Sequence, residues 1–248
     1  MVVEPLLGVF LFNCRGVCKV GRLLEAVIFD MDGLMIDTEE TYREGWLLGA
    51  QALGVELPET FVKGAAGRSI DDNIQALNAI LDDMSLVMAI RNVREKHFHQ
   101  SLAEGNIPLK PYLPELIQLL KKNQIRTAVA TSSYRKRAMG IFDYYQMDTW
   151  FDAVVTDDEV KMVKPNPELY LTALDMLGVE NQQALVLEDT VTGASAANNA
   201  DIPFIIVPDS SSDKPIVIPE DFKYMQAKLV NLENVAEWLI KQQLIEKR

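Results

Sequence analysis

Short apolar runs alternate with segments of helical pattern along most of this 248-residue chain. The expected strands are Ala26–Phe29, Thr127–Ala130, Ala153–Thr156, Ala184–Leu187 and Phe204–Val207. The expected helices are Pro114–Lys122, Tyr134–Tyr145, Pro167–Leu177, Gly193–Ala200 and Val235–Leu244. Short, wholly apolar strands are typical of parallel sheets that helices cover on both faces. The pattern therefore predicts an α/β fold with a doubly wound, mostly parallel sheet.

The charge balance narrows the class of partner. The chain has 24 basic and 36 acidic residues, a formal net charge of −12, whereas nucleic acids and anionic membranes select basic surfaces. We therefore expect a small soluble partner, no nucleic acid and no membrane. The apolar run Leu6–Phe12 is too short to span a bilayer and follows Glu4 rather than basic residues, so we expect a cytoplasmic protein. The sequence does not specify the oligomeric state, and a monomer is the working expectation.

Two carboxylates, Asp30 and Asp32, stand where the first expected strand meets solvent. Side chains alternate along a strand, so these two acids start on the same side and need a cation or protein donors to stay ionised. Magnesium is the simplest cation, and it also allows a carboxylate site to accept a phosphate dianion. The pair is equally compatible with a simple turn at the end of the strand, because Asp and Gly are common turn residues.

Polar residues also follow three later strands. Thr131 and Ser132 precede a helix, where they suit either a phosphate site or an ordinary N-cap. Lys164 precedes another helix start and reads by itself as a solvated surface charge. Glu188 and Asp189 form a second acidic pair at a strand end, where they either share one ion with the first pair or belong to an exposed turn.

Three longer strings carry a family resemblance. They are FDMDGLMIDTEE around Asp30, KPNPELY from Lys164, and LEDTVTGASAANNADIP from Leu187. With the hydroxyls after the second strand, they resemble the four motifs of the haloacid-dehalogenase-like phosphatase and phosphomutase superfamily, in order, from about Leu24 onward. The resemblance is to the β-phosphoglucomutase-like and sugar-phosphate phosphatase branch, which has a helical cap inserted after the first motif. It implies an N-terminal extension over residues 1–24, a Rossmann-like core over 25–40 and 107–248, and a small all-helical cap over 41–106.

The resemblance also implies roles for the motif residues. Asp30 is the nucleophile that forms an aspartyl phosphate, and Asp32 is the general acid and base that also lends its backbone carbonyl to magnesium. The phosphate is held by Thr131 and Ser132 and neutralised by Lys164. Magnesium is held by the acids, with Asp189 favoured as a direct ligand and Glu188 as a ligand through water.

Cap residues are expected to choose the substrate. Arg68 lies in a glycine-rich loop, where an arginine is usually a solvated charge, but a cap arginine near this position binds the untransferred phosphate in related mutases. Those mutases have a histidine where this chain has Tyr42, and both residues are candidate substrate contacts. This departure favours a magnesium-dependent phosphatase acting on a small phosphorylated sugar or polyol. The alternatives are a β-phosphoglucomutase-like mutase and a catalytically silent binding protein on the same scaffold.

Overall fold

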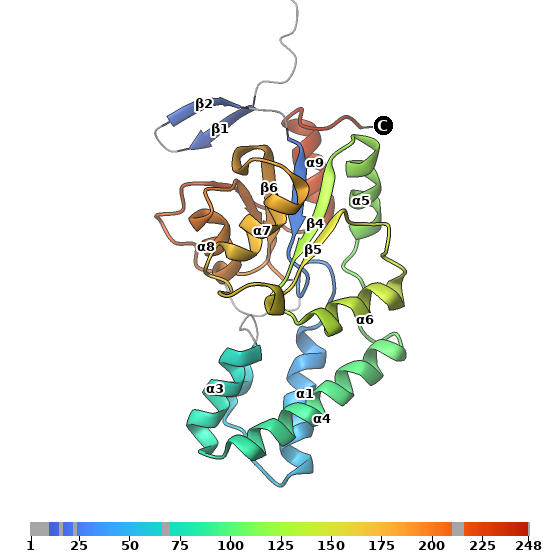
Figure 1. The fold of residues 1–248 in the computed structure, drawn as a ribbon, viewed down its shortest axis with the longest axis vertical. Coiled ribbons are helices and arrows are strands. Elements are labelled where there is room, and N and C mark those ends of the chain that lie inside the picture. The colour runs from blue at the N-terminus through green and yellow to red at the C-terminus, as the bar shows by residue number, and fades with distance from the viewer. Residues whose placement is uncertain (1–9, 15–16, 22–23, 66–69, 210–215, 248) are drawn as a thin grey trace, which may run out of the picture.

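A single parallel sheet forms the centre of the molecule (Figure 1). The computed structural model describes residues 10–14, 17–21, 24–65, 70–209 and 216–247. Within them, six strands lie in the order β5-β4-β3-β6-β7-β8, and all neighbours are parallel. The strands are β3 (Ala26–Phe29), β4 (Arg126–Ala130), β5 (Ala153–Val155), β6 (Ala184–Glu188), β7 (Phe204–Ile206) and β8 (Met225–Lys228). The predicted doubly wound sheet is confirmed, and the five predicted strands agree with β3 to β7 to within one residue at each end.

Helices cover both faces of the sheet, because successive side chains of a strand point to opposite faces. In β3, Val27 and Phe29 pack with one group of helices, whereas Ala26 and Ile28 pack with the other. The first group contains α5 (Leu113–Lys122), α6 (Arg135–Tyr145) and α9 (Leu232–Lys241). The second group contains α7 (Glu168–Leu177) and α8 (Val191–Asn199). Two short 3₁₀ turns, η1 (Asp157–Glu159) and η2 (Asn181–Gln183), complete the connections.

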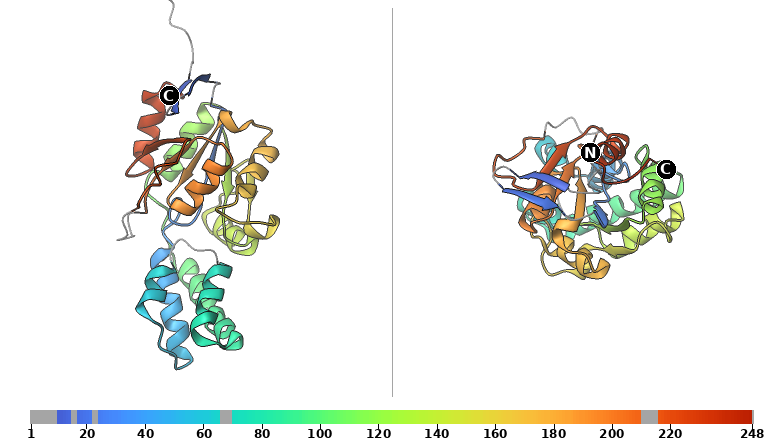
Figure 2. Two further views of the ribbon diagram at one scale, coloured as in Figure 1. Left: turned by 90° about the vertical axis from the view of Figure 1, so that its left-hand side faces the viewer. Right: turned by 90° about the horizontal axis from the view of Figure 1, so that it is seen from above.

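A hairpin precedes the sheet. Strands β1 (Phe10–Cys14) and β2 (Val17–Gly21) pair antiparallel within the segment that we expected to be an extension. The hairpin lies at one end of the molecule and a group of helices lies at the other (Figure 2). Neither this hairpin nor β8 was predicted from the sequence.

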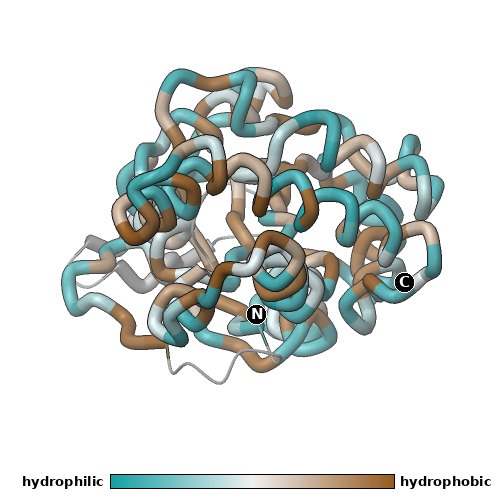
Figure 3. The backbone as a smooth tube through the Cα atoms, turned by 90° about the horizontal axis from the view of Figure 1, so that it is seen from below, coloured by the Kyte–Doolittle hydropathy of each residue, from teal (hydrophilic) through white to brown (hydrophobic). Residues whose placement is uncertain are grey.

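In the described part of the segment between β3 and α5, four helices form a unit with a hydrophobic core of its own. They are α1 (Glu39–Ala52), α2 (Glu59–Gly64), α3 (Ile70–Leu81) and α4 (Met84–Ala103). Their core contains Trp46, Phe61, Ile70, Ile74, Leu77, Val87 and Ile90. Figure 3 shows the backbone from the end of the molecule where these helices lie. Hydrophilic and hydrophobic residues alternate along the backbone in this view, as is typical of amphipathic helices. These residues therefore pack as a helical unit that is separate from the core of the sheet.

Two adjacent linkers connect the helical unit to the sheet. Ile36 and Leu109 form an antiparallel bridge. The Asp37 amide donates to the Pro108 carbonyl at 2.9 Å, and the Lys110 amide donates to the Met35 carbonyl at 2.8 Å. The chain therefore leaves the sheet and returns to it at one place. Among the described helices, none has the length and apolar character needed to cross a membrane.

Candidate active site

The register of the sheet brings distant residues to one edge. Phe29, the last residue of β3, pairs with Val129 in β4 and with Leu187 in β6. Because all three strands run in the same direction, the residues that follow these pairs emerge side by side. They include Asp30 and Glu188, which are separated by more than half of the chain in the sequence. The carboxyl end of a parallel sheet is the usual place for a ligand site.

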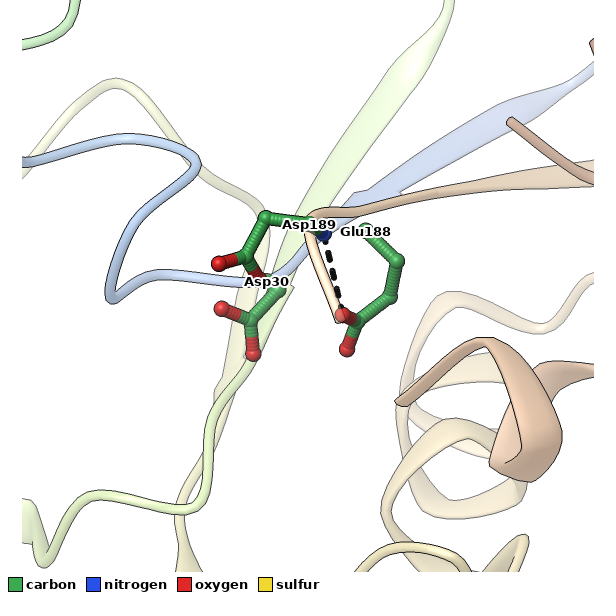
Figure 4. A group of neighbouring side chains, drawn as sticks. All are labelled: Asp30, Glu188 and Asp189. Carbon is green, nitrogen blue, oxygen red and sulfur yellow. Dashed lines mark hydrogen bonds between the residues drawn. The ribbon is translucent and has the colours of Figure 1, made fainter. Parts of the chain in front are cut away.

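Three carboxylates meet at this edge. Asp30, Glu188 and Asp189 each offer an oxygen, and these oxygens all lie within 4.8 Å of one another. The three side chains converge on one space at the strand ends (Figure 4). All three are buried, and Glu188 is fully buried. Three buried anions this close require compensating cations or donors.

Lys164 supplies one cation. Its Nζ donates to Asp30 Oδ1 at 2.5 Å, to Glu188 Oε1 at 2.7 Å and to the Ala130 carbonyl at 2.9 Å. Burial alone would lower the pKa of Lys164, but Asp30 and Glu188 outweigh it and hold that pKa well above its usual value. The lysine is therefore a fixed positive charge within the acidic cluster. The interpretation of Lys164 as a solvated surface charge is wrong.

One lysine does not neutralise all three acids. Burial raises the pKa of Asp30 to about 8, since the attraction of Lys164 only partly offsets burial and the charges of Glu188 and Asp32. Burial and the Asp30 charge likewise hold the pKa of Asp189 well above its usual range. With Lys164 as its cation, the cluster has too little positive charge to keep all three acids ionised. A bound divalent cation would supply the missing positive charge.

The two acids at the end of β6 differ in their hydrogen bonding. Glu188 Oε1 accepts from Lys164 and from the Tyr170 hydroxyl at 2.7 Å. Its Oε2 accepts from the amides of Asp189 and Thr190 at 3.1 Å and from the Thr190 hydroxyl at 3.0 Å. By contrast, Asp189 Oδ1 is buried and has no hydrogen-bond partner among the described residues. An oxygen donor set with one buried, unpartnered carboxylate oxygen fits magnesium, and Asp189 has the freer oxygen to offer it.

Two glycines make room for these carboxylates. A Cβ on Gly33 would lie 2.2 Å from Asp189 Oδ2, and the φ of Gly33 is +87°, which side chains rarely allow. A Cβ on Gly193, in the first turn of α8, would lie 1.6 Å from Glu188 Oε1. The small residues that follow each acidic pair are therefore part of the site.

Asp32 lies beside the cluster and accepts three hydrogen bonds. The Thr38 hydroxyl donates to Oδ1 at 2.9 Å, the Tyr42 hydroxyl donates to Oδ1 at 2.7 Å, and the Ser133 hydroxyl donates to Oδ2 at 2.8 Å. These donors come from the linker, from α1 and from the loop after β4. Asp32 is thus held by the sheet and the helical unit together.

Thr131 and Ser132 follow β4, and two further residues separate them from the start of α6. The Thr131 hydroxyl oxygen accepts from the Ser133 amide at 3.0 Å, which occupies one lone pair and leaves its own proton for another acceptor. Thr131 is buried, and Ser132 is partly buried. The N-cap position of α6 is Tyr134, so the interpretation of Thr131 and Ser132 as an ordinary N-cap is wrong, and both residues line the cleft that contains the acids.

One cleft contains most of the predicted site residues. Its volume is about 630 Å³, and it is lined by Asp30, Asp32, Tyr42, Thr131, Ser132, Lys164, Glu188 and Asp189. Arg68 lies outside the described residues. The same cleft contains residues that the sequence analysis missed, namely Thr38, Arg94, Ser133, Arg137, Thr190 and Asp209.

Asp209 could have been found from the sequence, because it comes shortly after β7, at the same edge of the sheet at which Asp30 follows β3 and Asp189 follows β6. It is buried, and Lys110 Nζ lies 2.5 Å from its Oδ1. Tyr170, which was also missed, holds Glu188 from α7 at a helical position that reads as ordinary core.

Comparisons with known proteins agree with this geometry. The model of the haloacid dehalogenase-like hydrolase family matches residues 27–207. The chain belongs to this family. A phosphorylated carbohydrates phosphatase from Thermotoga maritima is 30% identical over 181 residues, which cover 72% of this chain and 82% of the relative. Hexitol phosphatase B from Escherichia coli K12 is 29% identical over 209 residues, which cover 80% of this chain and 91% of that protein.

The fold is also similar to that of a solved structure. CbbY from Rhodobacter sphaeroides, in complex with phosphate, is 25% identical, with a TM-score of 0.72, and the match covers 86% of this chain and 96% of CbbY. The family and the fold expected from the four sequence motifs are therefore confirmed. The relatives that are named as phosphatases support a phosphoric monoester hydrolase.

Proposed function

We propose that this haloacid dehalogenase-like hydrolase is a magnesium-dependent phosphatase that acts on a small phosphorylated sugar or polyol. The observation that carries the proposal is the convergence of Asp30, Glu188 and Asp189 on one space, with Lys164 bonded to two of them. Buried acids with a fixed lysine form a site for an anion only when a further cation balances them. A phosphate ester with a divalent cation meets that requirement.

The residues take the following roles in the proposal. Asp30 attacks phosphorus and forms an aspartyl phosphate, while Asp32 protonates the leaving oxygen. Asp32 then removes a proton from the water that hydrolyses the aspartyl phosphate. Thr131 donates its free hydroxyl proton to a phosphate oxygen, Ser132 adds a second contact, and Lys164 neutralises the nucleophile and the phosphate.

Magnesium would be held by Asp30, by Asp189 and by the backbone carbonyl of Asp32, with Glu188 contributing through water. When bound, it supplies positive charge for the transferring phosphoryl group. Support for the direct role of Asp189 comes from its unpartnered Oδ1. Support for the indirect role of Glu188 comes from the protein donors that already fill both of its oxygens.

The substrate class follows from the relatives and the cleft. Two relatives are named for phosphorylated carbohydrates and for hexitols, and a cleft of about 630 Å³ suits a substrate of that size. In this proposal the helices of residues 41–106 act as a cap over the sheet, and Tyr42, which lines the cleft, belongs to the surface that faces the substrate.

Phosphate release tests the proposal. We expect purified protein with magnesium to release phosphate from members of a sugar and polyol monophosphate panel, and EDTA to stop the reaction. Asp30→Asn should abolish turnover, whereas Asp143→Asn, a surface change on α6, should leave it intact. The proposal fails if no panel member is hydrolysed. Conversion of β-glucose 1-phosphate to glucose 6-phosphate without phosphate release would instead identify a mutase.

A further inference from the structure

Two buried arginines flank Tyr42. Arg94 comes from α4 and Arg137 from α6, and their side chains are only 3% and 5% exposed. The guanidinium carbon of Arg94 lies 4.4 Å from the centroid of the Tyr42 ring, and that of Arg137 lies 4.9 Å from it. Burying two guanidinium groups costs desolvation free energy, which ion pairs and hydrogen bonds must offset. Neither arginine belongs to the four family motifs.

One carboxylate is shared between these two cations. Glu95 Oε1 accepts from Arg94 Nη1 at 2.6 Å and from Arg137 Nη2 at 2.5 Å. Burial and the charge of Arg137 lower the pKa of Arg94 to about 10, so Arg94 stays charged at neutral pH. Burial alone would lower the pKa of Arg137, but Tyr42, Glu95 and Asp32 hold it above its usual value. Arg137 is therefore a permanent donor held in place by the helical unit.

Arg137 also donates a hydrogen bond to Tyr42. Its Nη1 lies 3.2 Å from the Tyr42 hydroxyl oxygen, and a guanidinium group donates but cannot accept. The tyrosine oxygen must therefore accept from Arg137, and its single proton is left for Asp32 Oδ1 at 2.7 Å. A tyrosine hydroxyl carries its proton at neutral pH, so this proton remains available for the bond to Asp32.

We propose that Arg137 is a positioning residue for the acid–base step, because it directs the Tyr42 proton at Asp32 Oδ1 and so reserves Asp32 Oδ2 for proton exchange. The inference rests on the proposed function. Asp32 Oδ1 also accepts from Thr38, so two donors occupy it, whereas Oδ2 has the Ser133 hydroxyl, which can rotate.

The proton balance is simple. As the bond between phosphorus and the leaving oxygen breaks, the proton on Asp32 Oδ2 passes to that oxygen and the alcohol departs. As water attacks the phosphorus of the aspartyl phosphate, Asp32 Oδ2 takes up one proton of that water. The enzyme returns to its starting form, with an alcohol and inorganic phosphate as products.

The leaving group provides a specific test. An alkyl phosphate such as sorbitol 6-phosphate needs an acid to protonate its leaving oxygen, whereas p-nitrophenyl phosphate releases a stable anion and needs little help. General acid catalysis is worth about 10²–10⁴-fold. Hydrolysis of the aspartyl phosphate is common to both substrates, whereas kcat/KM reports the first transfer, in which the leaving groups differ. We therefore expect Arg137→Met to lower kcat/KM for sorbitol 6-phosphate about tenfold or more, and kcat/KM for p-nitrophenyl phosphate less than about threefold. The ratio of the two rates does not depend on the fraction of the variant that folds.

Three further measurements complete the test. Tyr42→Phe should change the ratio in the same direction, and the Tyr42→Phe, Arg137→Met double variant should lose little more than the larger single loss, since both residues act through one bond. Arg135→Met is the matched control, because Arg135 lies on the same helix but pairs with Glu159 at the surface, and its ratio should equal that of the wild type.

Two results would overturn the inference while leaving the proposed function intact. The first is an equal loss for both substrates in Arg137→Met, which indicates a merely structural role. The second is fully additive losses in the double variant. If the wild type with magnesium hydrolyses neither substrate, the proposed function itself fails and takes the inference with it.

Discussion

Removing the Lys164 charge tests how the acidic cluster is held together. In Lys164→Met, Asp30 and Glu188 lose their shared cation while a side chain of similar length remains. Glu188 keeps its bonds to Tyr170 and to Thr190, so most of the loss falls on Asp30. We expect a large loss of stability without magnesium and a smaller one with it.

The magnitude follows from the burial of the pair. Removing one partner of a buried ion pair costs about 3–5 kcal/mol. Because Glu188 remains hydrogen-bonded, we expect the lower end, about 3 kcal/mol. For a chain of this size, 1 kcal/mol shifts Tm by roughly 2–4 °C, so the Tm of Lys164→Met in EDTA should fall by about 6–12 °C. Magnesium should raise the Tm of the variant more than that of the wild type, since the site is then more negative.

Thermal unfolding in EDTA and in magnesium measures both effects. Lys161→Met is the matched control, because Lys161 is an exposed residue of the same loop and should leave Tm unchanged. The reasoning is refuted if Tm of Lys164→Met in EDTA falls by less than about 2 °C, or if magnesium stabilises the variant less than the wild type.

Three other substitutions give separate tests. Asp189→Asn should abolish the rise in Tm that magnesium produces, because it replaces the carboxylate that has the unpartnered oxygen with a neutral amide, and titration calorimetry would detect any binding that remains. Gly193→Ala should cost about 2 kcal/mol or more in urea unfolding, since its Cβ would lie 1.6 Å from Glu188 Oε1, whereas Gly140→Ala, with nothing within 4 Å, should not destabilise. Burial and neighbouring carboxylates raise the pKa of Asp157 to about 6, so the folded protein binds the extra proton and loses stability as pH rises from about 4 to 6. Urea unfolding at several pH values should show a weaker decline over this window for Asp157→Asn, and an unchanged decline would contradict this account.

The sheet was predictable from sequence because its inner strands are buried on both faces. Such strands appear as short apolar runs, and β3 (Ala26–Phe29) is buried at every position. The edge strand β8 (Met225–Lys228) is half-exposed and mixes polar with apolar residues, so no run marks it. The N-terminal hairpin likewise followed no pattern that distinguishes it from an extension.

The site was predictable as far as its strand ends. The expectation that ligands bind at the carboxyl ends of parallel strands, together with the family resemblance, placed Asp30 and Glu188 in one site. The parallel register of β3 and β6 does bring these two strand ends side by side. The bonds of Ser133 and Arg137 depend instead on how a loop and a helix lie against the helical unit. Their partners are 101 and 95 positions away, and Arg137 stands in a run of basic residues that reads as a solvated face.

The bridge between Ile36 and Leu109 has a consequence for how such proteins diversify. Because the helical insert starts and ends at neighbouring points, another cassette of any length can join the same two points without moving the strands. In the proposed function, the reaction chemistry and the choice of substrate then lie on separate pieces of chain. A single recombination event at this junction can therefore give an existing catalytic core a different substrate specificity.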